Sequence, residues 1–381
     1  MLIGIVKEIK NHEYRVGMVP ASVYELVQQG HGVVVESNAG MGIGFSDTDY
    51  LAMGASIVQT ATEVFASAEM IVKVKEPLAD ERVLLREGQI LFTYLHLAAD
   101  KTQTEDLISS KAVCIAYETV TSGGGGLPFS LPLLAPMSEV AGRMSVQAGA
   151  QCLEKSNGGS GLLLAGVPGV SPAKVVILGG GVVGSNAAKI AMGMGAKVVI
   201  LDRSLEVLRR LDNQFNSSQA GAGLETLYAS KDTVEQQVLS ADLVIGAVLI
   251  PGAAAPKLVS EDMIKQMRAG SAVVDVAIDQ GGCFETSHTT THADPTYIVD
   301  EVVHYCVGNM PGAVPRTSTF ALNNATLPYI VSIASKGYKA ALLDDPHLLN
   351  GLNVYKGKVT CRSVADSLGL EYVDAREALN I

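Results

Sequence analysis

The chain has 381 residues, 48% of them hydrophobic, and a formal net charge of −11. This length predicts two domains with separate cores, and the acidic balance argues against nucleic acid, whose phosphates attract basic surfaces. We expect a cytoplasmic protein without a membrane span or signal peptide, because apolar runs stay below about 20 residues and Lys7, Glu8 and Lys10 charge the N-terminus.

Short β-branched runs alternate with helical patterns through the first part of the chain. The predicted strands are Leu2–Val6, Val33–Glu36, Met70–Val74, Ile90–Thr93 and Val113–Ala116. The predicted helices include Ala21–Gln29 and Ala61–Ala68. Such alternation is typical of βαβ units and predicts a parallel, doubly wound sheet. This part lacks a glycine fingerprint, so we do not expect it to bind a nucleotide.

A connection rich in glycine and proline follows at Thr121–Pro136. Its glycine run, Gly123–Gly126, lacks the Lys-Ser/Thr and helix start of a phosphate loop, which favours a flexible connection. Ser138 is expected to be the N-cap of a helix that runs to about Cys152. Small residues on this helix would let another backbone approach closely: Ala141, Gly142, Ser145 and Gly149.

A second α/β pattern begins at Lys174. The predicted strands are Val175–Leu178, Lys197–Leu201, Leu243–Gly246 and Ala272–Val276, and the predicted helices are Val182–Met194, Leu205–Asn216 and Glu261–Met267. The tail from Pro311 to Ile381 is mainly helical by pattern. A long helix after Thr317 is expected to return the chain to the first domain.

Residues Gly179 to Gly184 read G-G-G-V-V-G and match G-x-G-x-x-G between a predicted strand and a predicted helix. Gly179 would permit the tight turn, Gly181 the approach of a pyrophosphate, and Gly184 close packing of helix on strand. The helix N-terminus, with Val183 in its first turn, supplies amide donors for phosphates. The pattern therefore predicts a Rossmann-type dinucleotide site.

Asp202 ends the next predicted strand, 18 residues after Gly184. A carboxylate there binds ribose hydroxyls and repels a 2′-phosphate, which favours NAD over NADP. Arg203 could offset that repulsion or stack on adenine, so the degree of NADP tolerance stays open. The plainer interpretation is a strand-ending aspartate beside a solvated arginine.

Three charged or titratable side chains outside this motif are candidates for binding or catalysis. Arg15 has a planar fork for a carboxylate, although composition alone favours a solvated arginine. Lys75 is preferred over Lys73 because ligands of α/β sheets gather at the carboxyl ends of strands. His96 follows another predicted strand, and histidine is the residue type best suited to proton exchange near neutrality.

Asp279 follows the predicted strand Ala272–Val276 and precedes two glycines. Asp275, inside that strand, is read more easily as a structural hydrogen-bond acceptor. No metal site is predicted, since His288 and His292 are separated by threonines that form helix poorly. Five separated cysteines without a C-x-x-C pair predict reduced thiols rather than a zinc site.

Six blocks of the chain resemble alanine dehydrogenases, in the family's order. They are Lys7–Val16, Lys73–Pro77, Tyr94–Ala98, Ala135–Gly142, Val276–Gly282 and Gly308–Pro311. The resemblance implies reversible, NAD-dependent oxidative deamination of L-alanine to pyruvate and ammonium by a homohexamer. It implies that Arg15 and Lys75 bind the substrate carboxylate and its carbonyl or imine. His96 would be the general acid/base and Asp279 the partner of water or the amine.

The same resemblance implies further cofactor contacts at Ser138, Val248, Asn309 and Met310. It also implies two doubly wound, Rossmann-like domains separated by a cleft. Residues 1–135 would begin the substrate domain, 136–310 would form the inserted NAD-binding domain, and 311–381 would return to the substrate domain. The chemistry would then take place in a closing cleft, with His96 facing Asp279.

Two other interpretations remain. The NAD-binding subunit of proton-translocating transhydrogenase is similar through the first domain and the fingerprint, but it differs where this chain reads Ile278–Gly282. A non-catalytic NAD sensor would not need Arg15, Lys75, His96 and Asp279 at predicted strand ends. Helices at Ser138–Cys152 and Thr317–Ser335 could supply the subunit interface of an oligomer. The breadth of amino-acid specificity and the physiological direction remain open.

Overall fold

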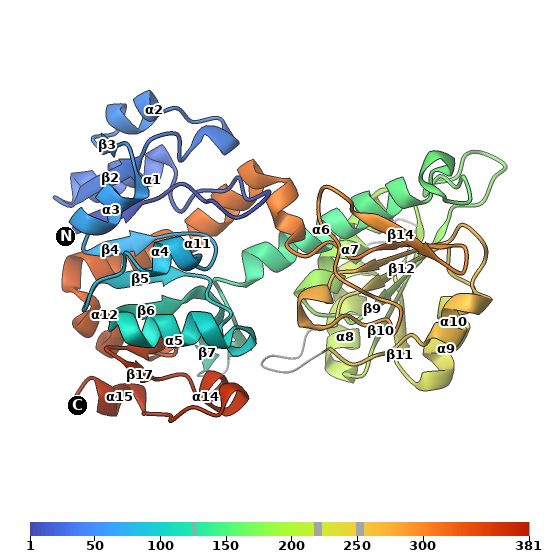
Figure 1. Ribbon diagram of the computed structural model, residues 1–381. Coiled ribbons are helices and arrows are strands. Elements are labelled where there is room, and N and C mark those ends of the chain that lie inside the picture. The colour runs from blue at the N-terminus through green and yellow to red at the C-terminus, as the bar shows by residue number, and fades with distance from the viewer. Residues whose placement is uncertain (125–126, 217–222, 249–254, 381) are drawn as a thin grey trace. The chain divides into compact units, whose positions relative to one another are not determined.

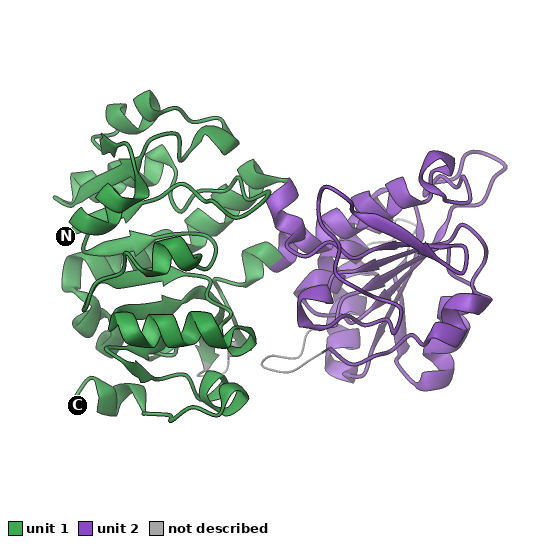
Figure 2. Ribbon diagram, viewed as in Figure 1, with its two compact units in different colours: residues 1–137, 314–381 green, residues 138–313 purple. Residues whose placement is uncertain are grey.

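The computed structural model describes residues 1–124, 127–216, 223–248 and 255–380 (Figure 1). The chain divides into two compact units, unit 1 with Met1–Met137 and Val314–Ile381, and unit 2 with Ser138–Ala313 (Figure 2). Unit 2 is therefore an insertion in the sequence of unit 1. The boundaries expected from the sequence were 135/136 and 310/311.

Unit 1 is built on an eight-stranded sheet of described residues, in the order β17-β16-β6-β5-β4-β1-β2-β3. The strands are β1 (Leu2–Ile5), β2 (Gly32–Glu36), β3 (Ser56–Val58), β4 (Met70–Val72), β5 (Ile90–Thr93), β6 (Val113–Ala116), β16 (Leu352–Tyr355) and β17 (Lys358–Val359). Strands β1 to β6 pair in parallel, whereas β16 is antiparallel to β6 and to β17. Because β4, β5 and β6 are parallel, their carboxyl ends lie at the same edge of the sheet.

Helices cover both faces of this sheet (Figure 1). They are α1 (Pro20–Gln28), α2 (Asp47–Ala52), α3 (Ala61–Ser67), α4 (Ala79–Arg82), α5 (Lys101–Ser110), α11 (Pro315–Lys336), α12 (Tyr338–Asp344), α13 (Pro346–Leu349), α14 (Arg362–Leu368) and α15 (Ala375–Ala378). Because strand side chains alternate between faces, Met70 and Val72 pack in one core and Ile71 in the other. Leu322 of α11 joins the first core and Leu107 of α5 the second, which makes the sheet doubly wound.

Unit 2 holds a seven-stranded sheet of described residues in the order β11-β10-β9-β12-β13-β15-β14. The strands are β9 (Lys174–Leu178), β10 (Lys197–Asp202), β11 (Glu225–Tyr228), β12 (Leu243–Gly246), β13 (Ala272–Asp275), β14 (Thr296–Val299) and β15 (Val302–Tyr305). The helices are α7 (Val182–Gly193), α8 (Leu205–Phe215), α9 (Lys231–Leu239) and α10 (Glu261–Gln266). Apart from antiparallel β14, this is the 3-2-1-4-5-6 strand order of a Rossmann fold. The expected α/β class with two doubly wound sheets is confirmed.

Helix α6 (Ala135–Cys152) begins in unit 1 and continues into unit 2. The expected N-cap at Ser138 is wrong, because Ser138 is already the fourth residue of the helix. Pro136 is compatible with a helix that begins at Ala135, because N–H groups in the first turn have no acceptor within the helix. A proline there therefore removes no helical hydrogen bond. The expected close approach is confirmed at Gly142, where a Cβ would lie 2.3 Å from the carbonyl oxygen of Val183.

The tail is mainly helical, as expected, with α11 to α15 between Pro315 and Ala378, and β16 and β17 also add two strands to the sheet of unit 1. The connection Thr121–Pro136, which was expected to be flexible, contains an antiparallel pair of short strands, β7 (Ser122–Gly124) and β8 (Leu127–Ser130). The glycine run Gly123–Gly126 is described only as far as Gly124. None of the helices in the described ranges is long and apolar enough to cross a bilayer.

Candidate active site

Arg15 lies in the segment between β1 and α1 and is only 2% exposed. Its Nε and Nη2 donate to the two carboxylate oxygens of Glu13 at 2.7 and 2.6 Å, and its Nη1 lies 3.0 Å from the Met137 Sδ. Burial by itself would lower the pKa of Arg15, but Glu13 outweighs it and raises that pKa. The solvated arginine that composition favours is therefore wrong, and the guanidinium is held charged inside unit 1.

Lys75 and Lys73 follow the end of β4, which stops at Val72 rather than at the expected Val74. Lys73 is fully buried, with its Nζ 3.1 Å from Glu8 and 2.6 Å from Glu81. Burial alone would lower the pKa of Lys73, but the two carboxylates outweigh it and hold that pKa above its ordinary value. Lys73 is thus a structural cation, which leaves Lys75 as the candidate for the substrate.

The backbone of Lys75 is held at both of its polar groups. Its N–H donates to Glu8 Oε1 at 3.3 Å, and its carbonyl oxygen accepts from the Thr93 hydroxyl at 2.9 Å. The side chain of Lys75 is 13% exposed, and its Nζ lies 3.7 Å from Glu76. These contacts fix the backbone from which the Lys75 side chain projects.

His96 follows β5 and has an exposed side chain. Its imidazole is nearly parallel to the ring of Tyr94, with an interplanar angle of 11° and centroids 5.9 Å apart. The Tyr94 hydroxyl donates to the Leu133 carbonyl oxygen at 2.5 Å, and burial raises the pKa of Tyr94 far above its usual value. His96 therefore combines a solvent-accessible, titratable ring with a rigid aromatic neighbour.

The glycine fingerprint forms the turn between β9 and α7 in unit 2. Gly179 has a φ of +101°, a conformation that favours glycine. A Cβ on Gly184 would lie 1.8 Å from the Gly179 carbonyl oxygen, whereas a Cβ on Gly181 would meet no atom within 4 Å. The third glycine thus allows helix and strand to touch, and the second leaves open space beside the helix N-terminus, as a pyrophosphate requires.

Asp202 at the end of β10 is tied to this turn. Its Oδ2 accepts the Gly180 N–H and its Oδ1 the Ser204 N–H, both at 2.7 Å. A carboxylate has further lone pairs, so Asp202 can still accept hydrogen bonds from ribose hydroxyls. Arg210, which sequence reasoning missed, donates from Nη2 to the Gly180 carbonyl oxygen at 2.8 Å. Arg203 is exposed.

The other predicted cofactor residues lie in different environments. Val183 packs its side chain in the core of unit 2, so a cofactor contact falls to its backbone. Met310 is buried in the same core, whereas Ser138, Val248 and Asn309 are partly exposed. Asn309 has a φ of +63°, and its carbonyl oxygen lies 3.1 Å from the Nε2 of His292.

Asp275 and Asp279 have the separate environments that the sequence analysis expected. Asp275 is fully buried, and its carboxylate accepts the Cys283 N–H at 2.8 Å and the Ser287 hydroxyl at 2.6 Å. Asp279 is exposed in the short turn Ile278–Gln280, and a Cβ on Gly308 would lie 3.0 Å from its Oδ1. The structural role of Asp275 is therefore confirmed, and Asp279 is the accessible carboxylate.

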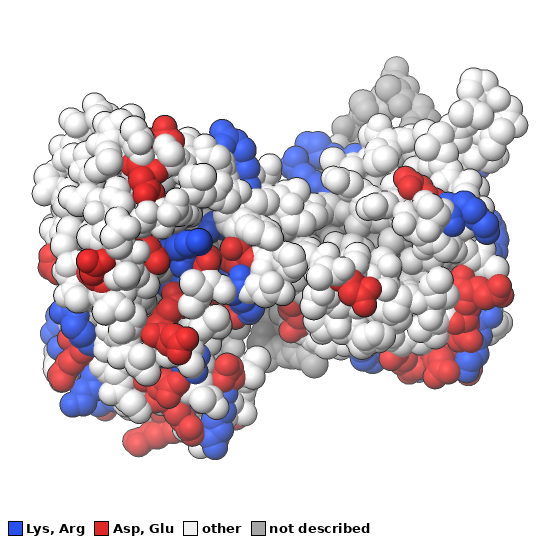
Figure 3. All heavy atoms as spheres, turned by 45° about the horizontal axis from the view of Figure 1, so that its top comes forward, with Lys and Arg blue, Asp and Glu red and all other residues white. Residues whose placement is uncertain are grey.

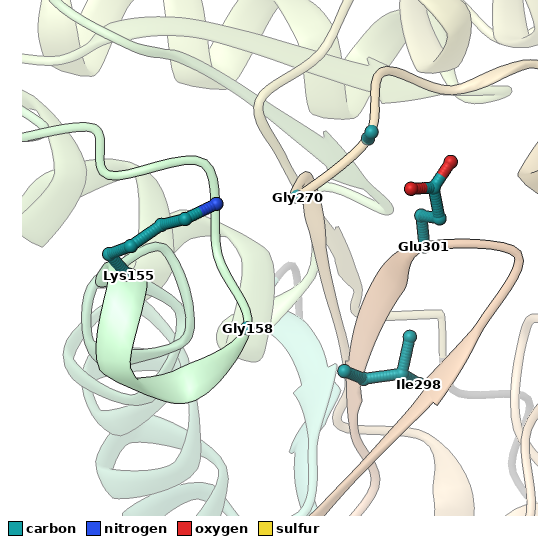
Figure 4. A pocket seen from close by; sticks show the side chains of 6 residues that line it. Lys155, Gly158, Gly270, Ile298 and Glu301 are labelled. Atoms are coloured by element: carbon teal, nitrogen blue, oxygen red, sulfur yellow. The ribbon is translucent and has the colours of Figure 1, made fainter.

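A hollow elsewhere in unit 2 is separate from these residues. It encloses about 240 Å³, and Lys155, Gly270 and Glu301 are among the residues that line it (Figure 4). Gly270 and Glu301 precede β13 and β15, so the hollow lies at the amino edge of the sheet, opposite the glycine turn.

On the face drawn in Figure 3, acidic and basic side chains are interspersed over unit 1.

The third glycine gives a direct test of the cofactor turn. Gly184→Ala is expected to raise the dissociation constant of NADH at least about tenfold, because its methyl group would displace the Gly179 carbonyl oxygen and open the turn. NADH fluorescence titration measures this. Gly193→Ala is the matched control on the same helix, since its Cβ would meet nothing within 4 Å. Equal NADH affinity in the two variants would refute the assigned role of the turn.

Comparison with known proteins places the chain in a family. Residues 4–141 match the model described as alanine dehydrogenase/PNT, N-terminal domain, and residues 145–362 match alanine dehydrogenase/PNT, C-terminal domain. A relative from Halomonas elongata, named alanine dehydrogenase, is 57% identical over 98% of this chain and 99% of its own.

Solved structures agree. One named L-alanine dehydrogenase is 53% identical, with a TM-score of 0.91 over 97% of this chain and 99% of that one. A transhydrogenase from Sinorhizobium meliloti, 22% identical with a TM-score of 0.79 over 95% of this chain and 100% of that one, shares the fold. The chain belongs to the alanine dehydrogenase/PNT family.

Proposed function

We propose that this chain is an NAD-dependent oxidoreductase that converts L-alanine and water to pyruvate and ammonium, and that it also catalyses the reverse reaction. The observation that carries the proposal is the 57% identity to an alanine dehydrogenase over nearly the full length of both chains. The glycine turn with Asp202 supports NAD as the cofactor, because it combines open space at Gly181 with a carboxylate at the end of β10.

Each candidate residue then has a chemical task. The buried, permanently charged guanidinium of Arg15 binds the substrate carboxylate, and Lys75 binds the oxygen or nitrogen on Cα. The glycine turn and Asp202 would hold NAD, which would supply the acceptor for the hydride from Cα. His96 takes up and returns protons as the imine forms and is hydrolysed, and its exposure lets it exchange them with solvent. Asp279 of unit 2 orients the attacking water or the departing amine.

One spectrophotometric assay tests the function. The purified chain is expected to reduce NAD when L-alanine is supplied at alkaline pH, and to reduce NADP more slowly because Asp202 repels a 2′-phosphate. L-Serine and 2-aminobutyrate, tested in parallel, measure the breadth of specificity. An absence of alanine-dependent NADH formation in a folded, NADH-binding protein would refute the proposal.

The transhydrogenase alternative is disfavoured by sequence, since this chain is 22% identical to the transhydrogenase but 53% identical to the solved L-alanine dehydrogenase. It predicts NAD/NADP hydride exchange that depends on added membranes. That exchange, in a chain inactive towards alanine, would favour the alternative.

We further propose a cytoplasmic homohexamer. All five cysteines are free, which suits a reducing compartment. Sedimentation analysis is expected to give six times the chain mass of 39.8 kDa. Gly142 and Gly149 of α6 contact Val183 and Leu243 of their own unit, so an interface on this helix must use its other faces.

A further inference from the structure

His96 has a backbone conformation that needs external support. Its φ of +52° and ψ of +37° lie in the left-handed region, which is uncommon for a residue with a Cβ and costs roughly 1 kcal/mol. Such a conformation persists when neighbouring groups over-determine it. Neighbouring groups must therefore hold the backbone at His96.

The carboxylate of Glu118 accepts both backbone N–H groups at this point. The His96 N–H donates to Glu118 Oε1 at 2.6 Å, and the Leu95 N–H lies 3.1 and 3.2 Å from the two oxygens. Hydrogen bonds to an ionised acceptor are shorter and stronger than neutral ones. From the other side, the buried Gln103 amide donates to the Leu95 carbonyl oxygen at 2.6 Å.

The sheet brings Glu118 to this place. Thr93 of β5 pairs with Ala116 of β6 in parallel register, so the segments that leave these strands run side by side. Glu118 lies two residues beyond Ala116, in the short turn Tyr117–Thr119. Its carboxylate therefore meets the backbone just beyond Tyr94, whose ring lies nearly parallel to the imidazole.

We propose that Glu118 is a positioning residue for His96: it holds the left-handed backbone that, together with Tyr94, sets the direction of the imidazole. This inference rests on the proposed function, in which His96 exchanges protons with the substrate. Glu118 itself acts through backbone amides. A displacement of about 1 Å at a reacting group can cost on the order of 100-fold in rate, so the effect of losing this support is measurable.

Four variants test the proposal. Glu118→Ala is expected to lower kcat for alanine oxidation by about 10- to 100-fold and to leave the NADH dissociation constant unchanged, because the glycine turn belongs to unit 2. Glu118→Gln keeps an oxygen acceptor and is expected to recover most of this loss. Glu118→Asp keeps the charge on a shorter side chain, and its kcat should lie between those of Glu118→Ala and Glu118→Gln. The control Asp345→Ala removes another carboxylate that accepts two backbone N–H groups, at 2.8 and 3.2 Å.

A double-mutant cycle separates positioning from general stability. In a His96→Ala background, Glu118→Ala is expected to cause no further loss of kcat, because Glu118 acts only through His96. A readout without turnover is the NMR signal of the His96 ring, which should shift in Glu118→Ala and stay unchanged in Asp345→Ala. Wild-type kcat and an unshifted ring in folded Glu118→Ala would overturn the inference, as would an equal loss of kcat in the His96→Ala background. An inactive wild type would refute the proposed function alone, since the ring signal still tests Glu118.

Discussion

Replacing His96 by alanine is expected to lower kcat for alanine oxidation by about 10²- to 10⁴-fold, the range that a general acid/base contributes. The methyl group cannot carry a proton, whereas the imidazole can and is exposed to solvent. NADH binding should remain at the wild-type level, because the glycine turn and Asp202 lie in unit 2. Steady-state kinetics and NADH fluorescence measure the two effects.

The companion variant is Asp279→Asn, which keeps the size of the side chain and removes its charge. Turnover is expected to fall again while NADH still binds. Asp275→Asn cannot serve as the control for Asp279→Asn, because the Asp275 carboxylate stabilises the local structure by accepting hydrogen bonds from the Cys283 N–H and the Ser287 hydroxyl. His347→Ala serves as the control for His96→Ala, because the His347 ring is hydrogen-bonded to the Thr121 hydroxyl at 2.9 Å. Near-normal kcat in either His96→Ala or Asp279→Asn would overturn the role assigned to that residue.

Replacing Lys73 by methionine is expected to destabilise unit 1 by about 3–5 kcal/mol, the cost of breaking a buried ion pair from one side. Methionine fits the volume but leaves Glu8 and Glu81 buried beside each other without a cation. Glu8 also accepts the Val74 N–H at 2.7 Å, so a shifted Glu8 carboxylate would disturb the segment before Lys75. Urea denaturation measures the loss of stability.

A surface lysine supplies the control for this experiment. Lys101 is paired with Glu105 on α5, but their side chains are 64% and 56% exposed. Lys101→Met should therefore change the free energy of unfolding by less than about 1 kcal/mol. Neutralising both carboxylates, in Lys73→Met with Glu8→Gln and Glu81→Gln, should recover much of the lost stability. Equal denaturation midpoints for Lys73→Met and Lys101→Met would show that the buried cluster contributes little.

Much of the fold was predictable because the pattern is local. Strands of a parallel sheet are buried on both faces, so they appear in the sequence as continuous hydrophobic runs such as Val175–Leu178. Short strands escaped prediction. Strands β3, β11, β14 and β17 lie at sheet edges, where one side is unpaired and the hydrophobic pattern is weaker. Strands β15 and β16 were also missed, because His304 and Asn353 interrupt their apolar runs.

The sequence by itself determined the dinucleotide turn, since Gly179 and Gly184 satisfy demands made within one strand-turn-helix unit. Only the tertiary structure decided the state of Arg15, Lys73 and His96. Their partners Glu13, Glu8, Glu81 and Glu118 are ordinary glutamates in the sequence, and all but Glu13 lie in other segments that the sheet brings together. Glu118 is half-buried and accepts backbone N–H groups. Burial converts Glu8, Glu13 and Glu81 from solvated charges into ion partners and hydrogen-bond acceptors, because a charge removed from water must find a partner inside the protein.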